Sequence, residues 1–146
     1  MDDYEDYEKE CERIRQENYQ LMKEFDLWLQ GKQLTESTIR KHLSNIDFYI
    51  NEFLLSEEPE PIKAKDGATE ICVFLGDWFI RKASWSSTSG IKSNVASLKK
   101  FYKFMCEKGL TEQKDLDNMK DAIKEYMPDW LDQMKRFDML LAHCQF

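Results

Sequence analysis

Glycine and proline are scarce in this chain, and they separate long segments in which apolar residues recur every three to four positions. Of 146 residues, five are glycine and three are proline. Folds rich in strands need many tight turns, which glycine and proline most often build. Apolar residues at helical spacing with so few turn residues predict an all-α fold.

The length and composition are those of one folded domain. A chain of 146 residues buries roughly 70% of the surface that its unfolded form exposes, so it needs no disulfide or metal to fold. Hydrophobic residues make up 42% of the chain and aromatic residues 13%, which supplies a core and excludes a disordered chain. We expect a bundle of four to five helices with a long N-terminal helix and an added C-terminal helix.

Capping and turn residues give the expected helix boundaries. The first helix spans residues 3–30 and stops at Gly31, and the second begins at an N-cap on Thr35 or Ser37 and ends near Leu55. Residues 56–67 carry two prolines, a glycine and three glutamates, which predicts a mobile, solvated connector. Further helices are expected at residues 69–83, 91–108, 110–127 and 128–142.

Pro128 is expected to end the fifth helix and to occupy the first turn of the sixth. The predicted organisation is therefore an acidic helical extension at 1–18, a helical bundle at 19–127 and a C-terminal helix at 128–146.

The first predicted helix has apolar residues at heptad spacing, with one asparagine among them. Such a stripe can pair with another subunit as a coiled coil, where Asn18 would fix the register, or it can pack on its own domain. Met22 and Leu29 widen the stripe beyond a narrow seam, which favours packing on its own domain. The stripe consists of Tyr4, Tyr7, Cys11, Ile14, Asn18, Leu21, Phe25 and Trp28.

Charge is unevenly distributed along the chain. The net charge is −7, with −6 in residues 1–31, +2 in residues 32–109 and −3 in residues 110–146. Only the middle region is suited to a polyanion, and its small excess predicts weak nonspecific binding to nucleic acid.

Lysines gather on one face of the fourth predicted helix. At 100° per residue, Lys92, Lys99, Lys100 and Lys103 fall within an arc of about 100°, away from an apolar set at Ile91, Val95, Leu98 and Tyr102. Ser93 and Ser97 are expected beside the lysines on the exposed face. Hydroxyls and lysines on one exposed helix face suit phosphate contacts, although solvated lysine ridges are also common.

The second helix places Arg40, Lys41 and Ser44 on the corresponding face. Asp47 stands there at the position that Lys99 holds in the fourth helix, and its carboxylate would repel phosphate.

No residue pattern predicts catalysis, a metal site or a cofactor. The two histidines, His42 and His143, have no ligand spacing with the four cysteines, and there is no CxxC. Phosphate-binding glycine loops and nucleophile elbows are missing from the sequence. An acidic start, MDDYEDYEKE, and the lack of an apolar run near 20 residues predict no leader, no membrane segment and a reducing cytoplasmic location.

Two segments together resemble the N-terminal core-binding domain of tyrosine recombinases, the phage-integrase class. They are QLMKEFDLWLQGKQLTESTIRKHLSNIDFYINEFL (20–54) and VFLGDWFIRKASWSSTSGIKSNVASLKKFYKFMCEKGL (73–110). The shared features are an F-x-x-x-L helix end, a Ser/Thr turn, a helix that ends in an aromatic followed by Phe-Leu, and a second Ser/Thr-capped helix ending at a glycine. The resemblance covers about two thirds of the chain.

This resemblance implies a SAM-like helical bundle that grips one side of a DNA duplex with its second and fourth helices. By position, the DNA-contacting residues would be Arg40, Lys41, Lys92, Ser93, Lys99, Lys100 and Lys103. We expect the catalytic domain of the family to be missing from this chain, because the sequence has no H-x-x-R: His42 is followed by LSN and His143 by CQF.

We therefore expect a non-catalytic module that binds double-stranded DNA. The alternative is a helical adaptor that keeps the fold, does not bind DNA, and pairs with a protein partner or a second copy through its N-terminal or C-terminal helix.

Overall fold

The computed structural model describes residues 3–56, 60–83 and 85–144, and every regular element in these ranges is helical. The all-α bundle with a long N-terminal helix is confirmed. In chain order the elements are α1 (Asp3–Gln30), α2 (Glu36–Phe48), η1 (Tyr49–Phe53), η2 (Leu54–Ser56), η3 (Ala64–Glu70), α3 (Ile71–Val73), η4 (Phe74–Trp78), α4 (Phe79–Lys82), α5 (Thr88–Glu107) and α6 (Gln113–Cys144). Of the short elements, η1 and η4 are π-helical turns, and η2 and η3 are 3₁₀ helices.

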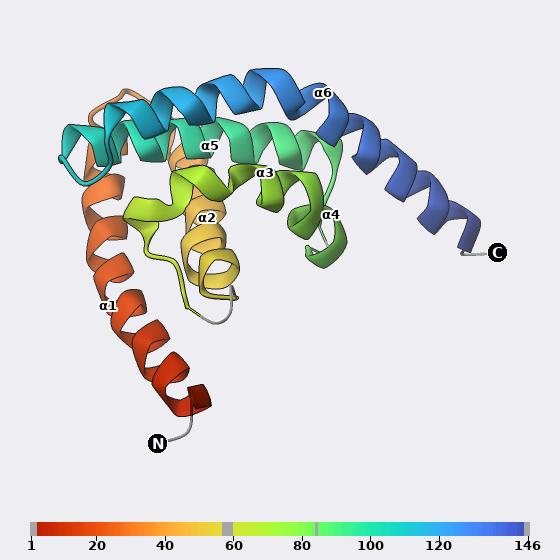
Figure 1. Ribbon diagram of the computed structural model, residues 1–146. Helices are drawn as coiled ribbons and strands as arrows, with labels where there is room; N and C mark the ends of the chain where they lie inside the picture. Colours follow the sequence, from red (N-terminus) through yellow and green to blue (C-terminus); the bar gives the residue numbers. More distant parts are fainter. Residues whose placement is uncertain (1–2, 57–59, 84, 145–146) are drawn as a thin grey trace.

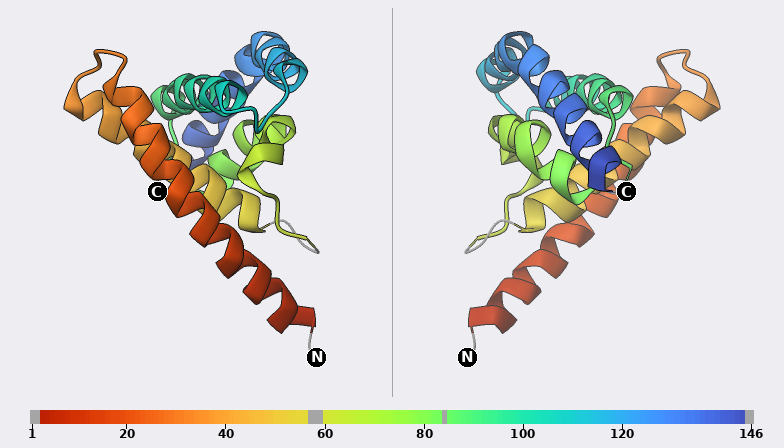
Figure 2. Two further views of the ribbon diagram at one scale, coloured as in Figure 1. Left: turned by 90° about the vertical axis from the view of Figure 1, so that its left-hand side faces the viewer. Right: turned by 90° about the vertical axis from the view of Figure 1, so that its right-hand side faces the viewer.

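The central helix of the bundle is α5, which packs against both α2 and α6 and also contacts α1. Figure 1 shows α6 running along α5, with α3 and α4 on the near side of the bundle. The two views in Figure 2 show α1 and α2 side by side. The N-terminal part of α1 and the C-terminal end of α6 extend beyond the other helices (Figure 1).

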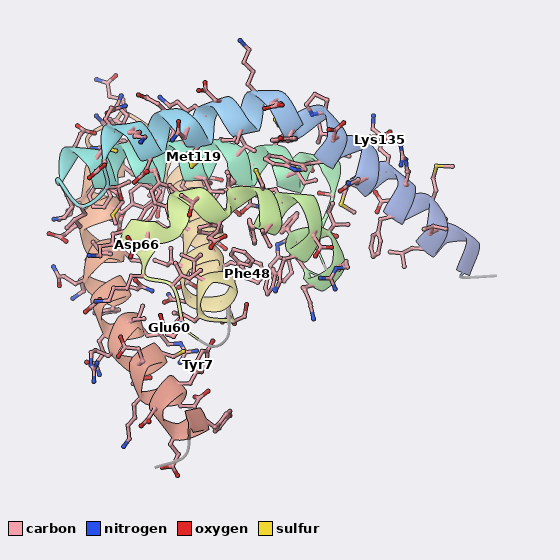
Figure 3. The ribbon with its side chains drawn as sticks, in the orientation of Figure 1. Tyr7, Phe48, Glu60, Asp66, Met119 and Lys135 are labelled. Carbon is pink, nitrogen blue, oxygen red and sulfur yellow. The ribbon has the colours of Figure 1, made fainter. Side chains whose placement is uncertain are left out.

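The core is built largely from aromatic and branched aliphatic side chains that every helix contributes. Phe25 of α1 packs edge-on against Phe101 of α5, with ring centroids 5.2 Å apart. On the opposite side of α5, α6 contributes Met119, which is buried and labelled in Figure 3. The largest fully buried side chains include Tyr49, Tyr102, Phe25, Phe53, Phe74, Phe79 and Phe101.

Two π-helical turns face each other in this core. Tyr49 and Phe53 of η1 pack on Phe74 of η4, with ring centroids 4.8 and 4.9 Å away. Trp78, at the end of η4, closes the group at 5.3 Å from Phe53. A π turn rotates the side chains that follow it relative to a regular helix, and here Phe53 and Phe74 each contact the other three rings of the group.

The last part of the predicted connector, residues 64–67, belongs to η3 and is anchored in the core, so a mobile, solvated connector is wrong for this part. The Tyr102 hydroxyl donates to the Ala64 carbonyl at 2.9 Å, and the Tyr49 hydroxyl donates to the Gly67 carbonyl at 2.6 Å. Ala64, Gly67 and Ala68 are buried. Residues 57–59 of the predicted connector lie outside the described residues.

The apolar stripe of α1 packs on its own chain, as the wider spacing favoured. Cys11 and Ile14 are buried with Leu55 in a small second cluster, and the Tyr7 hydroxyl donates to the Leu55 carbonyl. Asn18 is also buried and donates to the Ile50 carbonyl at 3.3 Å, and to the side chain of Asn51. The stripe is therefore not free to form a coiled coil, and α1 continues through residue 18 without a boundary.

Pro128 lies inside α6 and does not end it, so the predicted break between residues 127 and 128 is wrong. Proline removes the hydrogen bond to the carbonyl four residues earlier and bends a helix without always stopping it. Lys124 and Pro128 are both exposed, so water can solvate the carbonyl that loses its partner. Figure 1 shows that α6 changes direction between its half over α5 and its C-terminal half.

Gly67 gives a direct test of this packing. A Cβ atom at this position would lie 2.4 Å from the Tyr102 hydroxyl and 2.6 Å from Leu54 Cδ1. We predict that Gly67→Ala lowers the free energy of unfolding by about 1–3 kcal/mol, because the added methyl overpacks a filled site. Urea denaturation followed by circular dichroism measures the change.

Gly31→Ala is the matched control, because a Cβ there would have its nearest neighbour 3.5 Å away. Its expected effect is within about 0.5 kcal/mol. Equal stability of the two variants would contradict the role given to Gly67.

Candidate nucleic-acid interface

Local signals at both ends fix the length of α5. At its start the Ser87 hydroxyl accepts a hydrogen bond from the Gly90 amide at 2.9 Å, which is an N-cap. At its end Gly109 has a φ of 77°, and the Leu110 amide donates to the Met105 carbonyl. This left-handed glycine with a hydrogen bond back to the last turn is a Schellman motif. The helix is therefore one continuous, rigid support for the lysines between its ends.

Lys92, Lys99, Lys100 and Lys103, which we call the lysine ridge, lie together on the face of α5 that the bundle leaves open. Lys92, Lys99 and Lys103 are exposed, and Lys100 is half-buried. Among the described residues, none of the four has an ion pair or a side-chain hydrogen bond. Their ammonium groups are therefore available to an external anion.

The last turn of α5 is different, because its charged residues are held by α1. Lys108 pairs with Glu24 at 2.9 Å, and Glu107 accepts a hydrogen bond from the Trp28 indole at 3.1 Å. The lysine ridge therefore ends at Lys103.

The structure does not place the serines beside the ridge on an exposed face, which corrects that expectation. Ser97 is fully buried and Ser93 is half-buried. Asn45 of α2 donates to both hydroxyls at 2.9 Å, and Nδ1 of His42 lies 2.8 Å from Ser97 Oγ. Both serines therefore join α5 to α2.

Ser93 and Ser97 are covered because other helices pack on two flanks of α5. The sequence indicated one apolar stripe, but Asn94, Phe101 and Phe104 are buried as well. At 100° per residue, the buried arc of α5 is about 180° wide. Only the arc that carries the lysines remains open.

Arg40 and Lys41 lie on different flanks of α2. Lys41 is exposed and lies one turn from Asn45, which faces α5, so Lys41 is on the flank toward the lysine ridge. Arg40 lies 3.6 Å from Glu36 and lines a groove between α1 and α2 together with Asp26. The structure therefore groups Lys41 with the ridge and separates Arg40 from it.

Asp47, the carboxylate expected to conflict with phosphate, lies on the flank of α2 that faces α1. It accepts a hydrogen bond from Asn51, which in turn contacts Asn18 of α1. This residue is therefore turned away from α5.

Two residues of α2, His42 and Asn45, hold the flank of α5 beside the ridge through hydrogen bonds to Ser93 and Ser97, and neither was predicted to do so. The signal for them is a spacing pattern. These polar residues stand three apart beside an apolar stripe in α2, and two serines stand four apart beside the stripe of α5. Facing polar pairs of this kind indicate a buried row of hydrogen bonds between two helices. We call the row formed by His42 and Asn45 with Ser93 and Ser97 the seam.

The seam also affects the titration of His42. Burial lowers the pKa of His42 below its ordinary value of 6.5, and the positive charge of Lys100 lowers it further. The neutral imidazole is therefore the form that fits between α2 and α5.

The described residues contain no group of three or more histidine, cysteine, aspartate or glutamate side chains that could hold a metal ion. Cys11, Cys72 and Cys106 are free thiols, and burial raises the pKa of each. The side chains of His143 and Cys144 lie outside the described residues.

The described helices include none that is long and apolar enough to cross a membrane.

The seam predicts a pH-dependent stability. Below about pH 6.5 the unfolded chain protonates His42 while the folded chain resists, so the free energy of unfolding falls as the pH falls through this range. We expect His42→Gln to lose less stability than the wild type between about pH 7.5 and about pH 5.5, as measured by urea denaturation at each pH. His143 is present in both proteins and cancels in the comparison. Identical pH slopes would refute the assignment.

Comparison with models of known protein families, with curated proteins and with solved structures finds no match to this chain.

Proposed function

We propose that the protein is a non-catalytic DNA-binding module that contacts the phosphates of a duplex through the lysine ridge of α5. The observation that carries the proposal is the set of four lysines on one open helix face, without an acidic partner among the described residues. Lys41 of α2 extends this positive surface across the seam. Arg40 and Ser93 have no direct part in it, because Arg40 faces the α1–α2 groove and Ser93 is bonded to Asn45.

The dimensions of the ridge suit a nucleic-acid backbone. Lys92 and Lys103 are eleven residues apart in one helix, which is a distance of about 16 Å along the helix axis. One DNA strand advances by about 3.4 Å per base pair, so the ridge spans about five steps. Lysine is a mobile point charge, and a row of lysines follows phosphates without reading the bases.

The overall negative charge is compatible with this role because of where the acidic residues lie. The acidic N-terminal part of α1 contacts Leu55 and Lys63 and extends away from α5 (Figure 1). It therefore does not cover the lysine ridge. Long-range repulsion from a net charge of −7 still weakens association, so we expect binding that is strongest at low salt.

The resemblance of residues 20–54 and 73–110 to the core-binding domain of tyrosine recombinases supports the same surface. That family uses the second and fourth helices of its bundle, which by position are α2 and α5 here. With no recombinase catalytic residues in the sequence, the proposed role is binding without cleavage or rejoining of DNA.

The test is fluorescence anisotropy of a labelled duplex at low salt. We predict salt-sensitive binding by the wild type, with a slope of about −3 in log K against log salt for three to four phosphates. Lys99→Glu with Lys103→Glu should weaken binding at least tenfold and lower the slope by about two, because two phosphate contacts are lost.

Lys9→Glu with Arg15→Glu is the matched control. It makes the same change in net charge on exposed residues of α1, far from the ridge. The proposal requires a much smaller loss in this control. Equal losses in both variants would show that net charge acts and the ridge does not, and a folded wild type without salt-sensitive binding would overturn the proposed function.

A further inference from the structure

A cavity of about 410 Å³ lies between α1, the start of η3 and the turn that follows α5. Most of its surface is apolar, and its apolar wall consists of Leu21, Ala64, Met105 and Leu110. Cavities that hold small organic molecules have volumes of roughly 300–1,000 Å³ and are also mostly apolar, with a few polar groups that orient the ligand. This cavity is therefore of the right size and character for one small ligand.

Two hydrogen bonds fix the segments that form the walls of the cavity. The Leu110 amide donates to the Met105 carbonyl at 3.0 Å, within the Schellman motif that ends α5. The Thr111 hydroxyl donates to the Lys65 carbonyl at 3.0 Å, which ties the same turn to η3. A ligand therefore finds the walls already in place and does not have to order them.

Asn18 supplies the cavity with a hydrogen-bond acceptor. Its side chain lines the cavity and is only 1% exposed. Both N–H bonds of Nδ2 are used, because this group donates to the Ile50 carbonyl and to the Asn51 side chain. These two bonds also fix the orientation of the Asn18 amide.

The other amide atom of Asn18, Oδ1, accepts no hydrogen bond among the described residues. Every fully enclosed side-chain nitrogen or oxygen in the described part of the chain has a partner, so Oδ1 is not enclosed. Because Asn18 lines the cavity and is otherwise buried, Oδ1 opens on the cavity. A ligand that covers Oδ1 has to donate an O–H or N–H to it, since a buried acceptor without a partner is costly.

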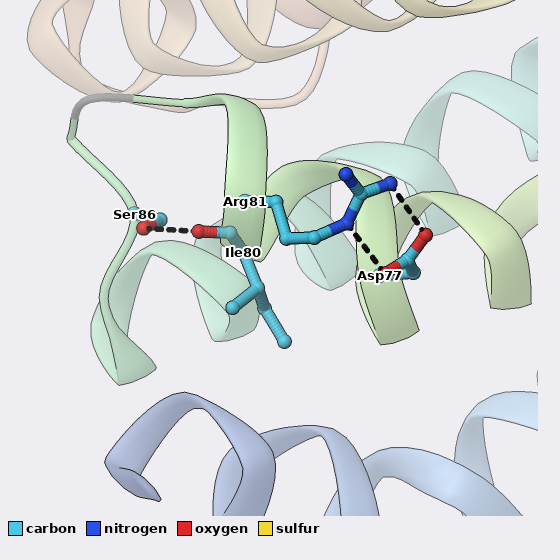
Figure 4. A network of polar contacts seen from close by, with 4 residues as sticks. All are labelled: Asp77, Ile80, Arg81 and Ser86. Atoms are coloured by element: carbon cyan, nitrogen blue, oxygen red, sulfur yellow. Dashed lines mark hydrogen bonds and ion pairs between the residues drawn. The ribbon is translucent and has the colours of Figure 1, made fainter. Parts of the chain in front are cut away.

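The rim of the cavity offers a cation that has no acidic partner among the described residues. Lys63 and Glu17 both line the cavity and lie 3.6 Å apart, whereas Lys65 is exposed and has no ion pair. Lys65 differs in this respect from Arg81, a cation beside another cavity, which makes two hydrogen bonds to Asp77 at 2.7 and 2.8 Å (Figure 4). The ammonium group of Lys65 is therefore available to an anionic group.

We propose that this cavity binds a small amphipathic anion, which has an apolar body, an O–H or N–H donor on that body and a carboxylate or sulfonate at one end. The body lies against Leu21, Met105 and Leu110, the donor binds Asn18 Oδ1, and the acidic end reaches Lys65. None of the residues of the lysine ridge lines the cavity. Ligand binding and DNA binding are therefore independent of each other and are tested by different experiments.

A titration of the full chain with anilinonaphthalene sulfonate tests the proposal, because this fluorescent probe carries apolar rings, an N–H and a sulfonate. We expect a saturable increase in its fluorescence, with a single site confirmed by isothermal titration calorimetry. Leu110→Glu should weaken binding by about tenfold, because it places a carboxylate in the apolar wall. Leu27→Glu is the matched control, because Leu27 is exposed on α1 outside the cavity. This control should bind the probe like the wild type.

Lys65→Glu tests the contact with the anionic end. This change should weaken binding of the probe by about fivefold. It should leave binding of phenylnaphthylamine unchanged, because this analogue keeps the rings and the N–H and lacks the sulfonate. Lys9→Glu makes the same change in net charge on an exposed residue of α1 and should bind both probes like the wild type.

The contact with Asn18 has its own measurement. In nitrogen–proton correlation NMR spectra the side-chain amide of Asn18 should shift when the sulfonate probe is added. The side-chain amide of Asn94, which donates to the Gly90 carbonyl outside the cavity, should not shift. A folded wild type without saturable binding, or binding that Leu110→Glu and Lys65→Glu both leave unchanged, would overturn the proposal.

Discussion

The burial of α5 between α2 and α6 is the constraint on which the other features depend. Because both flanks are covered, half of the helix surface is committed to the core and to the polar seam with α2. What remains is the other half of the helix surface, and four lysines lie on it. Charged side chains are almost never fully buried without a partner, so a helix in this position has few other places for them. Packing alone thus gathers the lysines into one surface.

Apolar periodicity and capping residues were sufficient to predict α1, α2 and α5 and the exposed lysines of α5. Thr35 and Ser87 cap α2 and α5 as Ser/Thr-capped turns should, and Gly109 ends α5 in a left-handed conformation. Lys92, Lys99 and Lys103 are exposed on the predicted arc. These caps, helix ends and exposed positions depend on local sequence, so each can be predicted from the sequence of one helix alone.

Features that depend on a second helix were harder to predict. Ser97 belongs to a face that one helical wheel marks as open and that α2 covers. Residues 64–67 of the predicted connector looked solvated because several are polar, whereas Tyr49 and Tyr102, which anchor them, stand 18 and 38 residues from the carbonyls that they bind. Pro128 lies inside a helix because its neighbours on that side face solvent. In each case a tertiary contact, or the lack of one, overrides a sound local rule.

The anchoring of η3 also separates the chain into parts with different tolerance to a change of length. The Ile62 amide donates to the Leu54 carbonyl at 2.9 Å, so the loop between them is closed by a hydrogen bond at its base. Residues added at the exposed Glu60 of this loop cost mainly chain entropy, about 0.6 kcal/mol for each doubling of the loop length. Residues added after Ala64 would instead shift Gly67 out of its fitted place beneath Tyr102. Glu60 is thus a suitable insertion point for a peptide tag or a reporter domain, because the added residues would not disturb the core.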